Sequence, residues 1–202
     1  MADRHWNGNL ITSTRRPPSN QASSGLFDLT SQHIFKAAEK WPGQRLSGLI
    51  YKYWTQSTTT TPNTQSGFEA LFTGTPNGTG THSTVINWDH TNSRGTKPSY
   101  LPADRFSWQV EGTIYIASSG TYAFGTGSDD GNQLTINGSI VTSYYGGRGV
   151  TGNVTTPTDT GQLYLTAGYK TFRYRMQEGA YGDGAYVCWS PPSQSGYAVV
   201  PA

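Results

Sequence analysis

The side chains of this chain that could do acid–base or nucleophilic chemistry are dispersed. Four histidines stand in four different contexts, none of them paired with a Ser or Cys motif: His5, His33, His82 and His90. The Asp89-His90 dipeptide beside Trp88 is the one catalytic-looking cluster. Its Asn-Trp-Asp-His-Thr-Asn setting more often forms an Asx turn with a packed tryptophan. We therefore expect a protein that is not an enzyme.

Other catalytic or cofactor chemistries find equally little support. A glycosidase could use two carboxylates, and several are available, but their presence alone does not define a pair: Glu69, Asp104, Glu111, Asp159 and Glu178. Cys188 is the only cysteine, so an internal disulfide is excluded, and it lacks neighbours at zinc-site spacing. We expect Cys188 to be a small buried strand residue.

Composition also narrows the class of partner. Charged residues make up 13% of the 202-residue chain, the formal net charge is +2, and Lys and Arg are scattered. A nucleic-acid interface usually needs a basic stripe, so we expect no nucleic-acid partner. No apolar run approaches the length of a membrane span, and no signal-peptide pattern begins the sequence, so we expect no membrane insertion and folding in a cytoplasm.

The elements that must position any site are mainly strands. From Arg45 onward the hydrophobic period is two, in segments bounded by Gly, Asn or Pro that include LSGLIYKYW, FSWQVEGTIYIA and AYVCWS. Between Thr55 and Gly80 we expect long loops around a short strand at 68–72. This pattern predicts an all-β fold, an antiparallel β-sandwich over residues 44–202.

Alternation along these strands also predicts which side chains form the core. Residues on one face of each strand share the interior. The predicted core residues are Phe106, Trp108, Ile114, Tyr122, Phe124, Leu134, Ile136, Leu163, Leu165, Phe172, Tyr174, Val187 and Trp189.

The first 43 residues have a different character. Residues 1–24 form a polar extended arm whose composition cannot bury enough apolar surface to order itself, so its contacts lie either on a partner or on its own domain. Residues 25–43 predict a short helix, capped by Thr30 or Ser31 and stopped by Pro42-Gly43. The segment SGLFDLTSQHIFKAAEKWPG resembles one that recurs in structural proteins of marine and cyanobacterial phages.

The second half of the chain resembles the anthrax-protective-antigen domain, a lectin-like β-sandwich of toxins, flocculins, glycosidases and adhesins. The matches follow the family order over about half of the chain. They are Phe106, Trp108 and Gly112, then Gly120-Thr121-Tyr122 with Phe124, Ser128-Asp129-Asp130-Gly131, Leu134-Thr135-Ile136-Asn137-Gly138, Leu165-Thr166-Ala167-Gly168-Tyr169, and Trp189 before Pro191. This resemblance implies the same sandwich.

The resemblance also implies a calcium site that binds sugar hydroxyls. In sugar-binding members a cis peptide joins the paired aspartates, so both carboxylates face one ion, and calcium prefers six to eight oxygen ligands. The implied metal ligands are Asp129, Asp130, Gln177, Glu178 and Asp183, and the implied sugar contacts are Asp129, Asp130 and Tyr181. Alternatively, the two aspartates only accept hydrogen bonds from turn amides, as in members that bind no sugar.

Two functions of different class follow from these features. The first, which we favour, is a phage virion structural protein, tail-associated or capsid-decorating, whose arm and helix dock on other virion proteins. Its sandwich then faces outward, either to bind host glycans or as an exterior module. The second is a free or secreted calcium-dependent lectin that binds cell-surface glycan. The corresponding locations are the virion and the extracellular space.

Overall fold

The computed structural model describes residues 49–91, 93–192 and 194–201. These belong to the second of two compact units, Gly48–Ala202. The predicted arm, 1–24, and the predicted helical segment, 25–43, lie outside the described residues. Among the described residues, no helix has the length and apolar character needed to cross a membrane.

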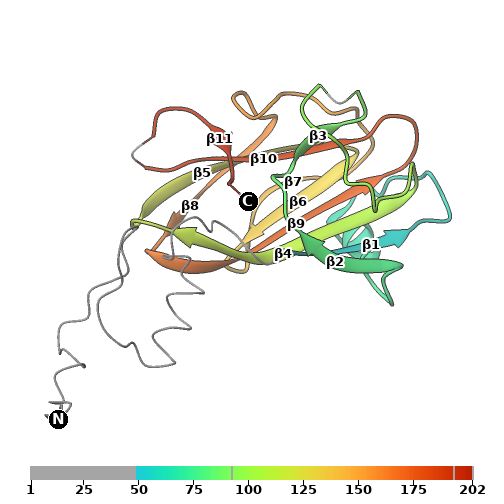
Figure 1. Cartoon of the computed structure of the whole chain (residues 1–202), viewed down its shortest axis with the longest axis horizontal. Helices are drawn as coiled ribbons and strands as arrows, with labels where there is room; N and C mark the ends of the chain where they lie inside the picture. The colour runs from blue at the N-terminus through green and yellow to red at the C-terminus, as the bar shows by residue number, and fades with distance from the viewer. Residues whose placement is uncertain (1–48, 92, 193, 202) are drawn as a thin grey trace, which may run out of the picture. The chain divides into compact units, whose positions relative to one another are not determined.

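Two antiparallel sheets make up this unit (Figure 1). The six-stranded sheet has the order β2-β1-β4-β9-β6-β7, and the five-stranded sheet has the order β11-β10-β5-β8, with β3 also paired to β10. The strands are β1 (Leu49–Thr55), β2 (Gly78–His82), β3 (Asn87–Asp89), β4 (Phe106–Ile116), β5 (Gly120–Asp129), β6 (Gly131–Ile136), β7 (Ser139–Tyr144), β8 (Asp159–Leu165), β9 (Gly168–Glu178), β10 (Gly184–Ser190) and β11 (Ala198–Val199). The predicted antiparallel β-sandwich is confirmed.

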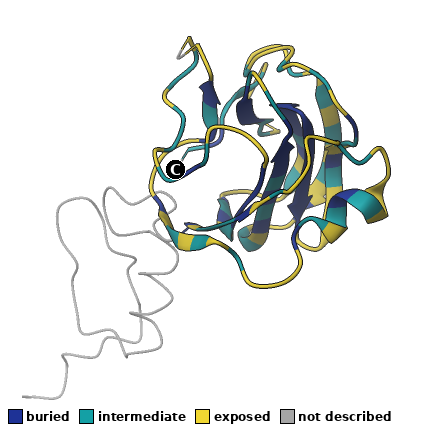
Figure 2. Ribbon diagram, turned by 90° about the vertical axis from the view of Figure 1, so that its right-hand side faces the viewer, coloured by how far each residue is buried: buried dark blue, intermediate teal, exposed yellow. Residues whose placement is uncertain are grey.

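Buried residues lie along the strands of both sheets (Figure 2). The largest fully buried side chains among them are mostly aromatic. Trp108 lies opposite Met176 in the β4–β9 pair, and both are fully buried. Trp108 contacts Trp88 and Tyr174 edge to face, with ring centroids 6.1 and 6.2 Å apart. Most of the predicted core residues are buried, whereas Leu163 and Trp189 are only half-buried because β8 and the end of β10 lie near the margin of the interior.

The region predicted as a strand at 68–72 contains a helix instead, α2 (Gln65–Ala70). The Thr64 hydroxyl caps it by accepting a hydrogen bond from the Gly67 amide at 3.2 Å. Phe68 and Phe72 are four residues apart, a spacing that fits one helical face, and both pack with Trp54. Apolar residues at 68 and 72 satisfy a period of two as well as a helical period, so the strand prediction was wrong.

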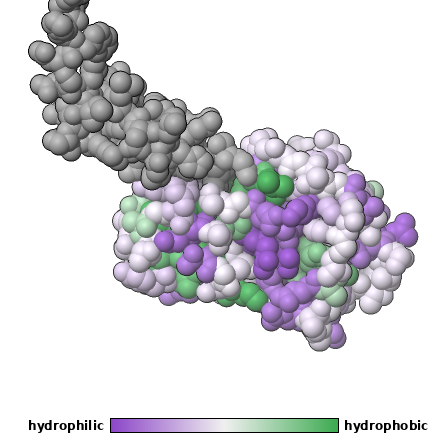
Figure 3. Space-filling model, turned by 90° about the horizontal axis from the view of Figure 1, so that it is seen from below, coloured by the Kyte–Doolittle hydropathy of each residue, from purple (hydrophilic) through white to green (hydrophobic). Residues whose placement is uncertain are grey.

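The outer face of the six-stranded sheet is polar. Lys52 of β1 pairs with Glu111 of β4 at 2.6 Å, and Gln109 donates to the same carboxylate at 2.8 Å. Arg175 of β9 donates to Gln109 at 2.6 Å. A hydrophilic band crosses the face seen in Figure 3. This network explains the polar half of the alternation, and the apolar half faces the core.

Candidate metal site at the strand ends

The site lies where the chain passes from one sheet to the other. Asp129 ends β5 in the five-stranded sheet, and Gly131 begins β6 in the six-stranded sheet. The Asp129-Asp130 peptide is cis, as the resemblance implied. Gly131 pairs with Gln177, which brings the end of β9, at Glu178, beside this crossing.

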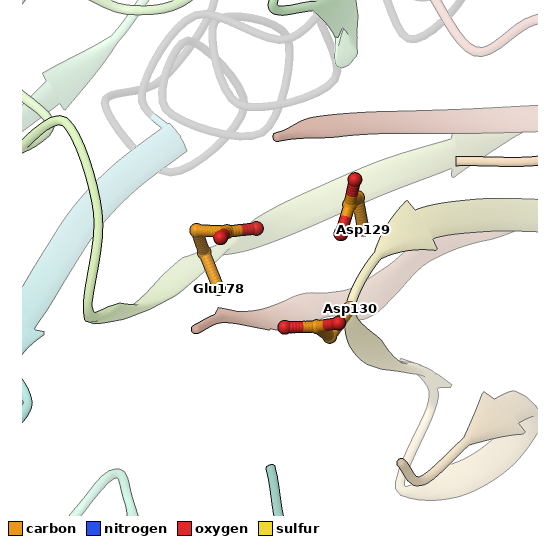
Figure 4. A group of neighbouring side chains, drawn as sticks. All are labelled: Asp129, Asp130 and Glu178. Atoms are coloured by element: carbon orange, nitrogen blue, oxygen red, sulfur yellow. The ribbon is translucent and has the colours of Figure 1, made fainter. Parts of the chain in front are cut away.

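Three carboxylates meet at this crossing (Figure 4). Asp129, Asp130 and Glu178 each offer one oxygen, and these oxygens lie within 4.8 Å of one another. The two aspartates are 9% exposed and Glu178 is fully buried. Acidic groups packed so closely away from water repel each other unless they are protonated or share a cation.

The pKa values of the cluster reflect this repulsion. Burial, together with the charges of Asp129 and Asp130, raises the pKa of Glu178 to about 9. Burial likewise raises the pKa of Asp129 to about 7, with contributions from Asp130 and Asp183. For Asp130, burial raises the pKa against the opposing effect of two backbone amides. The cluster is therefore unfavourable as three bare anions.

Asp130 and Glu178 differ in their hydrogen-bond partners. The Arg148 amide donates to Asp130 Oδ1 and the Gly179 amide donates to Asp130 Oδ2, both at 2.9 Å. These donors are remote in sequence, so Asp130 is not simply accepting from its own turn. Both Glu178 oxygens, by contrast, have no hydrogen-bond partner among the described residues. A buried carboxylate that accepts no hydrogen bond and lies beside two other acids is suited to bind a divalent cation that prefers oxygen ligands.

A salt bridge holds the segment that follows β7 against the crossing. The Arg148 guanidinium pairs with Asp159, with Nη1 to Oδ1 at 3.0 Å, and its Nε donates to the Ser128 carbonyl at 3.3 Å. Asn132 also donates to Asp159, at 2.9 Å. Arg148 therefore positions the amide that binds Asp130. Nothing in the sequence around Arg148 indicates this role, because the contacts of Arg148 join residues 11 to 20 positions apart.

The other predicted ligands lie in different surroundings. The Gln177 carbonyl accepts from the Asp130 amide at 2.8 Å, but alternation along β9 turns the Gln177 side chain to the face opposite Glu178. Asp183 is buried and its carboxylate is ion-paired with Lys97. The structure thus brings Asp129, Asp130 and Glu178 together and places Gln177 and Asp183 outside that cluster.

Tyr181, the predicted sugar contact, stands fully in solvent. Tyr181 is 97% exposed, its backbone adopts φ 82°, and its amide donates to Asp104 at 3.1 Å. The loop between β9 and β10 therefore presents an aromatic ring beside the crossing without burying it. Such a ring has a face available for stacking.

The Asp89-His90 dipeptide also lies near the site. The sequence did not predict that the dipeptide would be close to the paired aspartates. Asp89 forms the expected Asx turn, accepting from the Thr91 and Ser93 amides at 3.1 and 2.9 Å, and Trp88 is buried. Asp89 and Asp129 both pair with Gly184 in the sheet. The only sequence signal was the dipeptide itself, because its proximity to Asp129 depends on β3 pairing with β10.

Cys188 is free and buried, as predicted.

Comparisons with known proteins agree with this fold and place the chain in a family. The family model of the PA14 domain matches residues 46–201. The PA14 domain of the antifreeze protein MpAFP is similar in structure, with TM-score 0.60 and 21% identity over 79% of this chain and 90% of that one. The PA14 sugar-binding domain of an RTX adhesin has TM-score 0.58 and 17% identity over 76% and 94%.

Two further structures extend this set. The epithelial adhesin 9 A domain of Candida glabrata, in complex with Galβ1-3GlcNAc, has TM-score 0.55 and 17% identity over 77% of this chain and 87% of that one. An anti-sigma factor domain-containing protein has TM-score 0.56 and 20% identity over 77% of this chain, which spans only 46% of that protein's length. No curated protein matches the sequence. Because the family model covers well over half of the sequence, the chain belongs to the PA14 domain family.

Proposed function

We propose that this domain binds carbohydrate without catalysing a reaction, using a calcium ion held by Asp129, Asp130 and Glu178. The observation that carries this proposal is the fully buried Glu178 carboxylate, which has no hydrogen-bond donor among the described residues and lies beside two further acids. Carboxylate oxygens are the ligands that calcium prefers. When bound, calcium supplies direct coordination of sugar hydroxyls.

The structural neighbours support the carbohydrate part of the proposal. One is a PA14 sugar-binding domain of an adhesin, and another is an adhesin domain in complex with a disaccharide. In this chain the exposed ring of Tyr181 offers a stacking surface for a sugar on the solvent side of the carboxylates. A cell-surface glycan is therefore the partner that we propose.

Calorimetric titration tests the cation site. We expect calcium to bind and to release about one proton or more at pH 7, because Glu178 has a pKa of about 9 and Asp129 of about 7 in the free protein. The measured heat should then differ between buffers of different ionisation enthalpy, and affinity should rise from pH 6 to pH 9. A calcium titration without heat or thermal stabilisation would contradict the proposal.

A glycan array tests the carbohydrate part separately. Full-length protein should bind a defined set of glycans with calcium present, and this binding should disappear when a chelator removes the ion. A protein that binds calcium but retains no glycan would contradict the carbohydrate part alone.

The virion role stays a prediction of its own. We propose that residues 1–43 attach the domain to another virion protein, which rests on the polar arm and on the phage-like segment that follows it. Deleting these residues should abolish incorporation into particles, while calcium and glycan binding stay within about twofold of the full chain, because the site residues lie in a separate compact unit. Truncated protein that still assembles would favour the free or secreted lectin.

A further inference from the structure

His90 lies at the edge of the carboxylate cluster, on a loop with a firmly held backbone. The His90 amide donates to the Asp183 carbonyl at 2.8 Å. The preceding Asp89 binds the Thr91 and Ser93 amides and forms an ion pair with Arg94 at 3.2 Å. The imidazole itself is exposed to solvent. The backbone therefore holds this side chain in place beside the site while leaving its ring free to meet a ligand.

Gly182 separates the His90 ring from Asp129. A methyl group added at Gly182 would lie 3.0 Å from His90 Cε1 and Nδ1 and 3.2 Å from Asp129 Oδ2. The imidazole and the carboxylate thus both lie close to the Gly182 Cα, on the side where a larger residue would place its side chain. Pairing of Gly184 with both Asp89 and Asp129 fixes the backbones of β3 and β5 on either side of β10.

We propose that His90 is a specificity-determining residue of the sugar site, where its imidazole hydrogen-bonds a hydroxyl of the bound sugar beside Asp129. This inference rests on the proposed carbohydrate function. A neutral imidazole has one donor and one acceptor nitrogen, and a sugar hydroxyl can engage either. His90 then favours glycans that carry a hydroxyl at the matching position of the sugar ring. A sugar that lacks this hydroxyl leaves the imidazole without a hydrogen-bond partner and binds more weakly.

Substitutions at His90 test the proposal at a calcium concentration that calorimetry shows to saturate each variant. His90→Ala should weaken the best glycan on the array about tenfold and change the order of preference, because one hydrogen bond is lost. His90→Gln retains a donor and an acceptor and should recover most of the affinity. NMR spectra of the full chain give a second readout. The imidazole signal of His90 is assigned as the one that is absent from the spectrum of His90→Gln. In wild type this signal should shift when the glycan is added.

Glycine substitutions supply a matched pair. Gly182→Ala should reduce glycan binding at least tenfold, because its methyl group occupies the space between His90 and Asp129. Gly149→Ala is the control, since its methyl would come no nearer than 4.0 Å to Asp129 Oδ2 and meets nothing else. We expect its array profile to equal that of wild type.

The outcomes separate the two proposals. Wild-type protein that binds no glycan with calcium would refute the carbohydrate function and the inference with it. Wild-type binding with an unchanged profile in His90→Ala would overturn the inference alone and leave the proposed function standing.

Discussion

Glu178→Gln is expected to weaken calcium binding about 100-fold or more, because it removes one of three clustered carboxylates and calcium affinity depends strongly on ligand charge. The same change should leave the calcium-free domain at least as stable at pH 7. Both Glu178 oxygens lack hydrogen-bond partners among the described residues, so the amide forfeits none. At pH 7 the carboxyl of Glu178 must take up a proton when the chain folds, because its pKa rises from 4.5 to about 9, and glutamine avoids that cost. Calcium titration and thermal unfolding, each with and without calcium, measure the two effects.

The raised pKa of Glu178 also predicts how the stability of the calcium-free protein changes with pH. The pKa of Glu178 is about 9 in the folded state and lies above its ordinary value of 4.5, so the native state retains a proton that the unfolded chain releases. The free energy of unfolding of calcium-free wild type should therefore fall as pH rises from about 4.5 toward about 9. Glu178→Gln should remove much of that slope, and an identical slope in both proteins would contradict the assignment.

Controls distinguish this effect from a general loss of an acid. Glu111→Gln removes a carboxylate on the outer face of the six-stranded sheet, where it pairs with Lys52, and should leave calcium affinity within about twofold. Asp130→Ala should also abolish calcium binding, but it strips the acceptor from the Arg148 and Gly179 amides and so destabilises the crossing as well. Glu178 is therefore the cleaner position.

Phe124→Ala is expected to lower the free energy of unfolding by about 3 to 5 kcal/mol, since it empties a fully buried site in the core. Phe124 lies in the middle of β5, opposite Trp189 of β10 and Gly161 of β8, and its ring lies 6.4 Å from that of Tyr122. Backbone on both sides limits collapse of the cavity. Urea unfolding followed by tryptophan fluorescence measures the loss.

Tyr164→Ala is the matched control on the neighbouring strand. Tyr164 is 65% exposed, and removing its ring should cost under about 1 kcal/mol. A comparable loss in the two variants, or a loss below about 1 kcal/mol for Phe124→Ala, would mean that β5 is displaced by one residue.

Strand alternation was sufficient to predict most of the sandwich, because a period of two puts every second side chain in the core whichever strands pair. Phe106, Trp108 and Tyr174 were assigned to the interior on that basis and are fully buried. The same reasoning failed at α2, where the Thr64 cap and the packing of Phe68 and Phe72 on Trp54 decided between two periods that the apolar pattern satisfies equally.

The sequence by itself determined that this chain forms an antiparallel sandwich and that Asp129 and Asp130 are adjacent acids at a strand end. Only the tertiary structure decided what surrounds them. Glu178 and Gln177 are neighbours with similar chemistry, yet the pairing of β9 with β4 and β6 turns only Glu178 toward the aspartates. Arg148 and His90 come to the site through contacts between remote segments. Local patterns carry periodicity and turns, whereas partners across a sheet depend on pairing that no single segment encodes.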